Sequence, residues 1–113
     1  MPRHVLRDQR SAMDHLTFLA RRDITPPIGI YARQWGAAET DVAEGIHRPL
    51  ELTAFYFQER TGGDPLLLLA MDGFMFRDGS DEFSIRKPLL DHFRIGPERL
   101  LFNVSHTHAS CSI

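Results

Sequence analysis

Two histidines near the carboxyl end of the chain have the residue type and spacing for chemistry. His106 and His108 lie two positions apart, directly after residues 100–105 (LLFNVS), which are predicted to form a strand. Alternate residues of an extended chain point to the same side, so both imidazoles converge if the strand geometry continues. Neutral imidazole is a common zinc ligand and also transfers protons. An isolated H-x-H pattern is equally typical of two polar histidines at a strand end, so both interpretations stay open.

The elements that position this pair form a βαβ unit. An apolar strand is predicted over residues 66–72, a helix beginning near residues 80–82, and a second strand over residues 100–105. The crossover should be right-handed and the two strands parallel. Asp72 and His106 would then lie at the same carboxyl edge, where open α/β sheets bind ligands. Asp72 is expected to accept the second N–H of a metal-binding imidazole.

The preceding segments predict the rest of the sheet. Alternating apolar residues indicate strands over residues 15–23 and 50–59, and the turn at residues 61–64 joins the second of them to the 66–72 strand as a hairpin. The 66–72 strand is apolar on both faces, which predicts cover on both sides. The expected fold is α/β, a mixed sheet with a β-hairpin followed by the βαβ unit. Residues 24–49, interrupted by prolines and glycines, read as a long ordered loop.

Length and composition exclude several classes of protein. The chain has 113 residues and a net charge of −2, with 13 basic and 15 acidic residues, so no nucleic-acid partner is expected. Its single cysteine cannot form an intrachain disulfide. The longest apolar run, residues 66–71, is far shorter than the roughly 20 residues of a transmembrane segment. Residues 1–14 form a polar tail without the features of a signal peptide, so a cytoplasmic location is expected.

Three short blocks occur in an order that is shared with one enzyme family. Residues 22–29 (RDITPPIG), 44–50 (EGIHRPL) and 101–109 (LFNVSHTHA) are similar to DITPP(I/V)G, GIHDPL and (A/S)THTHSGP. These motifs belong to the amino-terminal catalytic domain of neutral/alkaline non-lysosomal ceramidases. Residues 96–99 (GPER) also resemble the segment that precedes the last block. The resemblance covers about residues 20–109.

This resemblance implies a zinc-dependent hydrolase that cleaves a small-molecule or lipid-like N-acyl amide with metal-bound water. His106 would be a zinc ligand, and the catalytic His108 would assist substrate binding or proton transfer. His47 would lie beside the site with no assigned role. The family's other ligands, a second His, a Glu and a Tyr, come further downstream. Residues 15–113 are therefore expected to be the incomplete amino-terminal portion of a ceramidase-like α/β hydrolase domain, inactive alone and binding zinc weakly or not at all.

Two other interpretations remain. The chain could be a catalytically dead remnant or a small interaction module that keeps the fold without the chemistry. It could also be the start of a metal-dependent amidohydrolase barrel, whose first strand ends in H-x-H, although the Pro-Pro and Gly-Ile-His blocks would then be coincidental. Because a parallel strand normally has neighbours on both sides, self-association through an uncovered sheet edge is also expected.

Overall fold

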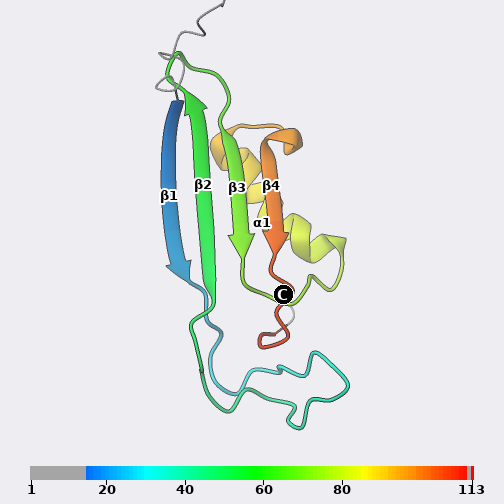
Figure 1. Ribbon diagram of the computed structural model, residues 1–113. Coiled ribbons are helices and arrows are strands. Elements are labelled where there is room, and N and C mark those ends of the chain that lie inside the picture. The colour runs from blue at the N-terminus through cyan, green and yellow to red at the C-terminus, as the bar shows by residue number, and fades with distance from the viewer. Residues whose placement is uncertain (1–14, 112) are drawn as a thin grey trace, which may run out of the picture.

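Four strands form one mixed sheet in the order β1-β2-β3-β4, and one α-helix packs behind it (Figure 1). This computed structural model describes residues 15–111 and 113. The predicted polar tail, residues 1–14, lies outside the described residues. The elements are β1 (His15–Asp23), β2 (Glu51–Glu59), β3 (Leu66–Met71), α1 (Gly79–Phe93), a 3₁₀ turn (Pro97–Arg99) and β4 (Leu100–Val104).

The pairing of the strands confirms the predicted α/β class and topology. β2 runs antiparallel to both β1 and β3, and β3 with β2 forms the expected hairpin. β4 runs parallel to β3, with Leu67 opposite Leu100 and Met71 opposite Val104. β2 begins at Glu51, one residue later than predicted, because the Leu50 N–H donates to the Thr25 hydroxyl. The βαβ unit therefore brings β3 and β4 together with their carboxyl ends at one edge.

Helix α1 begins at a side-chain cap and continues through a proline. Asp78, in extended backbone, accepts hydrogen bonds from the amides of Ser80 and Asp81, which satisfies two free donors of the first turn. Pro88 lies inside the helix and does not divide it. The helix ends at Phe93 and is capped by Arg94, whose backbone is left-handed and whose N–H donates to the Leu90 carbonyl. In the described part of the chain, no helix is long and apolar enough to cross a membrane.

The hydrophobic core lies between α1 and one face of the sheet. Its buried members are Leu67, Leu69, Ile95 and Leu100. Partly buried residues of β2, β4 and the helix pack around them: Leu52, Ala54, Tyr56, Leu89, Leu90, Phe93 and Phe102. Since side chains of a strand alternate between faces, residues 66, 68, 101 and their neighbours in register must point to the other face.

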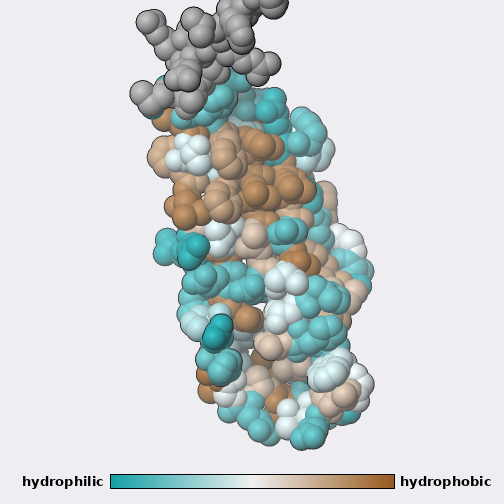
Figure 2. Space-filling view, in the orientation of Figure 1, coloured by the Kyte–Doolittle hydropathy of each residue, from teal (hydrophilic) through white to brown (hydrophobic). Residues whose placement is uncertain are grey.

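That other face carries no helix among the described residues, so the prediction that β3 is covered on both sides is wrong there. Leu66 is 41% exposed and Leu101 is 62% exposed. Figure 2 shows apolar side chains gathered over the strands on the side turned away from α1. We call this surface the open face; its large apolar residues, assigned from the strand register, are Leu19, Phe55, Phe57, Leu66, Leu68 and Leu101.

Candidate functional site

Residues 24–50 leave the sheet between β1 and β2 and form an ordered arm beyond the carboxyl edge of β3 and β4 (Figure 1). The two sides of the arm pair with each other: Gly29 N–H donates to the Ala43 carbonyl at 2.8 Å, and Ala43 N–H donates to the Ile30 carbonyl at 2.9 Å. At the base, Ile24 N–H donates to the Leu50 carbonyl at 2.9 Å. The predicted long loop is therefore held in a defined path by its own backbone.

Thr25 joins the first two sequence blocks. Its N–H and hydroxyl donate to Asp23 Oδ1 at 2.8 and 2.5 Å, and its hydroxyl oxygen accepts from Leu50 N–H at 2.9 Å. The hydrogen bond from the Thr25 side chain, and then that from its backbone, lowers the pKa of Asp23. Gly29 has a φ of 90°, which favours glycine at the end of the first block. The spacing Asp-x-Thr-x-x-x-Gly therefore has a local structural reason.

The segment that carries the histidines continues alongside the end of β3. Ser105 N–H donates to the Met71 carbonyl at 2.9 Å, and Thr107 N–H donates to the Gly73 carbonyl at 3.1 Å. His106 departs from extended geometry, with a φ of 60° in the left-handed region. The imidazole centroids of His106 and His108 nevertheless lie 5.1 Å apart with the rings near perpendicular. The two rings thus meet through a turn of the backbone and not through continued strand geometry.

The ring of His106 is held by a backbone carbonyl. Its Nδ1 lies 3.0 Å from the Phe74 oxygen. A carbonyl oxygen can only accept, so Nδ1 donates this bond, and in the neutral imidazole Nε2 then presents a lone pair. Metal-binding histidines are usually oriented by such a bond from their second nitrogen. In the structure the acceptor for the second nitrogen of His106 is the Phe74 carbonyl and not the Asp72 carboxylate. Asp72 Oδ2 instead accepts from Glu51 N–H at 3.0 Å.

Two aromatic side chains border the histidine pair. The Phe74 ring lies 4.6 Å from that of His106 and 4.7 Å from that of His108, measured between centroids. Trp35, on the arm and 56% exposed, lies 6.2 Å from His108. Phe74 follows the end of β3 by three residues, and no periodic or motif signal in the sequence selects it. Its importance depends on the turn at His106, which only the structure shows.

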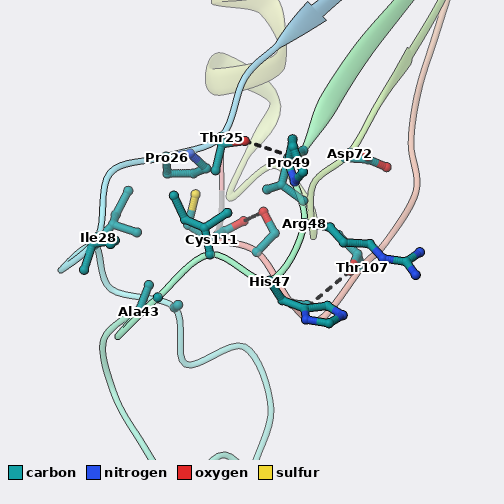
Figure 3. Close-up of a pocket in the computed structure, with 17 residues that line it drawn as sticks. Thr25, Pro26, Ile28, Ala43, His47, Arg48, Pro49, Asp72, Thr107 and Cys111 are labelled. Atoms are coloured by element: carbon teal, nitrogen blue, oxygen red, sulfur yellow. Dashed lines mark hydrogen bonds between the residues drawn. The ribbon is translucent and has the colours of Figure 1, made fainter.

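A cavity of about 310 Å³ lies between the arm and the segment 107–111 (Figure 3). All three sequence blocks contribute residues to its lining. These are Thr25, Pro26 and Ile28 of the first block, Gly45, Ile46, His47, Arg48, Pro49 and Leu50 of the second, and Thr107 and Ala109 of the third. His47 and Asp72 both line this cavity. His106 and His108 do not line it, although Thr107 and Ala109 of the same segment do.

The wall of the cavity is mainly apolar. Figure 3 shows the Cys111 sulfur pointing toward Pro26 and the Arg48 guanidinium extending away from Ile28. Ser110 also lines the cavity; it is largely buried, and its hydroxyl donates to the Cys111 carbonyl at 3.3 Å. The cavity therefore suits an uncharged apolar group better than an ion.

The histidine pair is not by itself a complete catalytic zinc site. Such a site takes three protein ligands and keeps one position open. Within residues 15–111 and 113, no group of three or more His, Cys, Asp or Glu side chains is placed to hold a metal. The described residues therefore offer two imidazoles, one of which has a fixed free nitrogen, and no third ligand.

No family model, curated protein or solved structure matches the chain, so its resemblance to the neutral/alkaline ceramidases stays a prediction.

Proposed function

We propose that this chain contributes part of the active site of a zinc-dependent, ceramidase-like amide hydrolase. The observation that carries the proposal is the His106 imidazole, whose Nδ1 is anchored to the Phe74 carbonyl and whose ring centroid lies 5.1 Å from that of His108. In this proposal His106 is a metal ligand. His108 lies close enough to bind the substrate beside the metal or to move a proton there.

The convergence of the three sequence blocks supports the same function. Blocks that are far apart in the sequence meet around one cavity, next to the segment that carries the two histidines. Its apolar wall offers a place for the apolar part of a small-molecule or lipid-like N-acyl amide. His47 belongs to this wall and would contact the substrate and not the metal.

The remaining zinc ligands must lie outside the described residues under this proposal. Two imidazoles hold zinc weakly, because a catalytic site normally combines three protein ligands. The isolated chain should therefore bind zinc weakly and hydrolyse no amide.

Calorimetric titration of the full chain with Zn²⁺ tests the proposal. We expect weak binding that is lost in His106→Ala and reduced in His108→Ala. His92→Ala is the matched control: His92 lies in the last turn of α1, against Phe93, and its loss should leave the titration unchanged. Zinc binding that is the same in the wild type and in His106→Ala would refute the role given to His106.

A binding or interaction module without catalysis is the second candidate, and the exposed apolar residues of the open face favour it. Loss of zinc binding in His106→Ala would count against it. The amidohydrolase-barrel alternative is weaker, because β4 follows three strands of a mixed sheet that contains two antiparallel pairs. The strand before H-x-H in that alternative would be the first strand of a parallel barrel.

A further inference from the structure

β1 is a long edge strand that is exposed on both faces. All nine of its residues pair with β2, and no described strand pairs with its other side. Phe18, on the face toward α1, is 60% exposed, and Leu19, on the open face, is 56% exposed. The cause is the position of α1, which lies behind β3 and β4 and leaves β1 uncovered (Figure 1).

The usual protections of an edge strand are missing from most of β1. Natural edge strands carry charged residues, proline or a bulge, or are short. The charged residues of β1 are confined to its last three positions, residues 21–23. Residues 15–20 contain no Lys, Arg, Asp, Glu or Pro, and the uninterrupted register with β2 excludes a bulge. The opposite edge is different: β4 has only five residues, and Arg86 Nη1 donates to the Leu100 carbonyl at 3.0 Å. β1 is therefore the edge that can accept another strand.

We propose that β1 pairs with β1 of a second copy of this chain, antiparallel and centred on Leu19. Facing residues of an antiparallel pair point to the same side of the sheet. A two-fold axis normal to the sheet therefore passes beside one residue, which faces its own copy in the second strand. Only the centre at Leu19 pairs all nine residues of His15–Asp23. Neighbouring centres leave two residues of each strand without a partner.

Hydrogen-bonding and size complementarity favour this centre. It places His15 opposite Asp23 of the second copy at both ends of the strand, and Phe18 opposite the small Ala20. An imidazole N–H can donate to a carboxylate, so His15 and Asp23 can form a hydrogen bond across the pair. A centre at Phe18 would instead place His15 opposite Arg21 and leave Asp23 without a partner. The register centred on Leu19 is thus the one that pairs the whole strand and brings His15 to Asp23.

The paired sheets would also extend the open face. Both α1 helices would lie on one side of the joined sheet and both open faces on the other, with the two Leu19 side chains next to each other. The apolar surface seen in Figure 2 would become continuous across the two copies, and β1 would lose its free edge.

Sedimentation equilibrium of the full chain tests the proposal, with a species of twice 12.9 kDa expected. Leu19→Lys should lower the association constant about 10-fold or more, because it places two like charges opposite each other and removes apolar contact. Leu101→Lys is the matched control, a similarly exposed leucine of the open face on the far edge, and should associate like the wild type. A wild type that is monomeric at every concentration, or association that Leu19→Lys does not weaken, overturns the proposal.

Cysteine cross-linking tests the register separately, in a Cys111→Ser background. Facing residues of an antiparallel pair lie about 4.5 to 5.5 Å apart between Cα atoms, within the range of a disulfide. Leu19→Cys should therefore form an intermolecular disulfide on mild oxidation, whereas Arg21→Cys, whose symmetry mate is displaced along the strand, should not. Cross-linking through position 21 and not through position 19 would overturn the register.

Discussion

The Nδ1 atom of His106 lies 3.0 Å from the carbonyl oxygen of Phe74, and this hydrogen bond determines which nitrogen of the imidazole is free. The bond connects the turn after β4 to the segment after β3, the two strand ends that the parallel βαβ unit brings together. Because the acceptor belongs to the backbone, side-chain substitutions at position 74 leave it in place. The packing of the rings and the orientation of His106 can therefore be tested separately.

Phe74→Ala should loosen the histidine pair. The Phe74 ring contacts both imidazoles, and each such aromatic contact contributes about 0.5 to 1.5 kcal/mol to the free energy of unfolding. Urea unfolding should show this loss, and the NMR signals of both imidazoles should broaden or shift. Phe83→Ala, at an exposed position on α1, should change stability by less than about 0.5 kcal/mol. Equal effects of the two substitutions would contradict the contacts assigned to Phe74.

The backbone at His106 should prefer glycine over alanine. Its φ of 60° lies in the left-handed region, where a Cβ atom costs roughly 1 to 2 kcal/mol and glycine has no such cost. His106→Gly should therefore unfold at a higher urea concentration than His106→Ala. At His108, which has no positive φ, the glycine variant should be the less stable of the two. The same order at both positions would argue against the left-handed turn.

Truncation of two adjacent leucines on β4 should destabilise the protein to very different extents. Leu100 is buried against α1, and Leu100→Ala should reduce the free energy of unfolding by about 2 to 5 kcal/mol. Leu101 lies on the open face, and Leu101→Ala should cost no more than about 0.5 kcal/mol. Chemical denaturation of the two variants measures the difference. Similar losses at both positions would mean that the open face is covered.

The cap of α1 should make stability depend on pH in the acid range. Hydrogen bonds from the Ser80 hydroxyl, then from the amides of Ser80 and Asp81, lower the pKa of Asp78 below its usual 3.8. The carboxylate therefore stabilises the folded state above pH 3.8, and this contribution disappears as the pH falls through the lower pKa of the folded state. Urea midpoints measured across this range should report the loss.

Asp78→Asn is the control for that dependence, because asparagine keeps the capping acceptor but does not titrate. The midpoint of the wild type should exceed that of the variant most at neutral pH, and the difference should shrink on acidification. A difference that stays constant with pH would show that the charge of Asp78 contributes nothing to the cap.

The strands, the hairpin and the parallel pair could be predicted from the sequence because the deciding signals are local; the pairing of β1 with β2 comes from the structure. The alternation in residues 15–23 defines β1, and the short turn before Leu66 forces an antiparallel hairpin. A helix between β3 and β4 then requires a parallel pair. The shared edge of Asp72 and His106 follows from that topology alone.

The details of the site could not be predicted in this way. The role of Phe74 depends on the left-handed turn at His106, and no residue pattern in the sequence predicts that turn. The cavity depends on the pairing of Gly29 with Ala43 across the arm, a contact between residues that lie in no periodic element. The open face was not predicted, because β3 is apolar on both faces and such a strand normally has cover on both sides. The pattern does not show which segment would supply that cover.

Long-range ¹H–¹⁵N correlation spectra of the histidine rings, recorded during a zinc titration of the full chain, test the metal-ligand role of His106 most directly. At alkaline pH, where imidazole is neutral, His106 should be the Nδ1–H tautomer in the free protein. Added Zn²⁺ should then shift its Nε2 resonance and that of His108, while His92 stays unchanged. An Nε2–H tautomer at His106, or resonances of His106 that do not respond to zinc, would contradict the account.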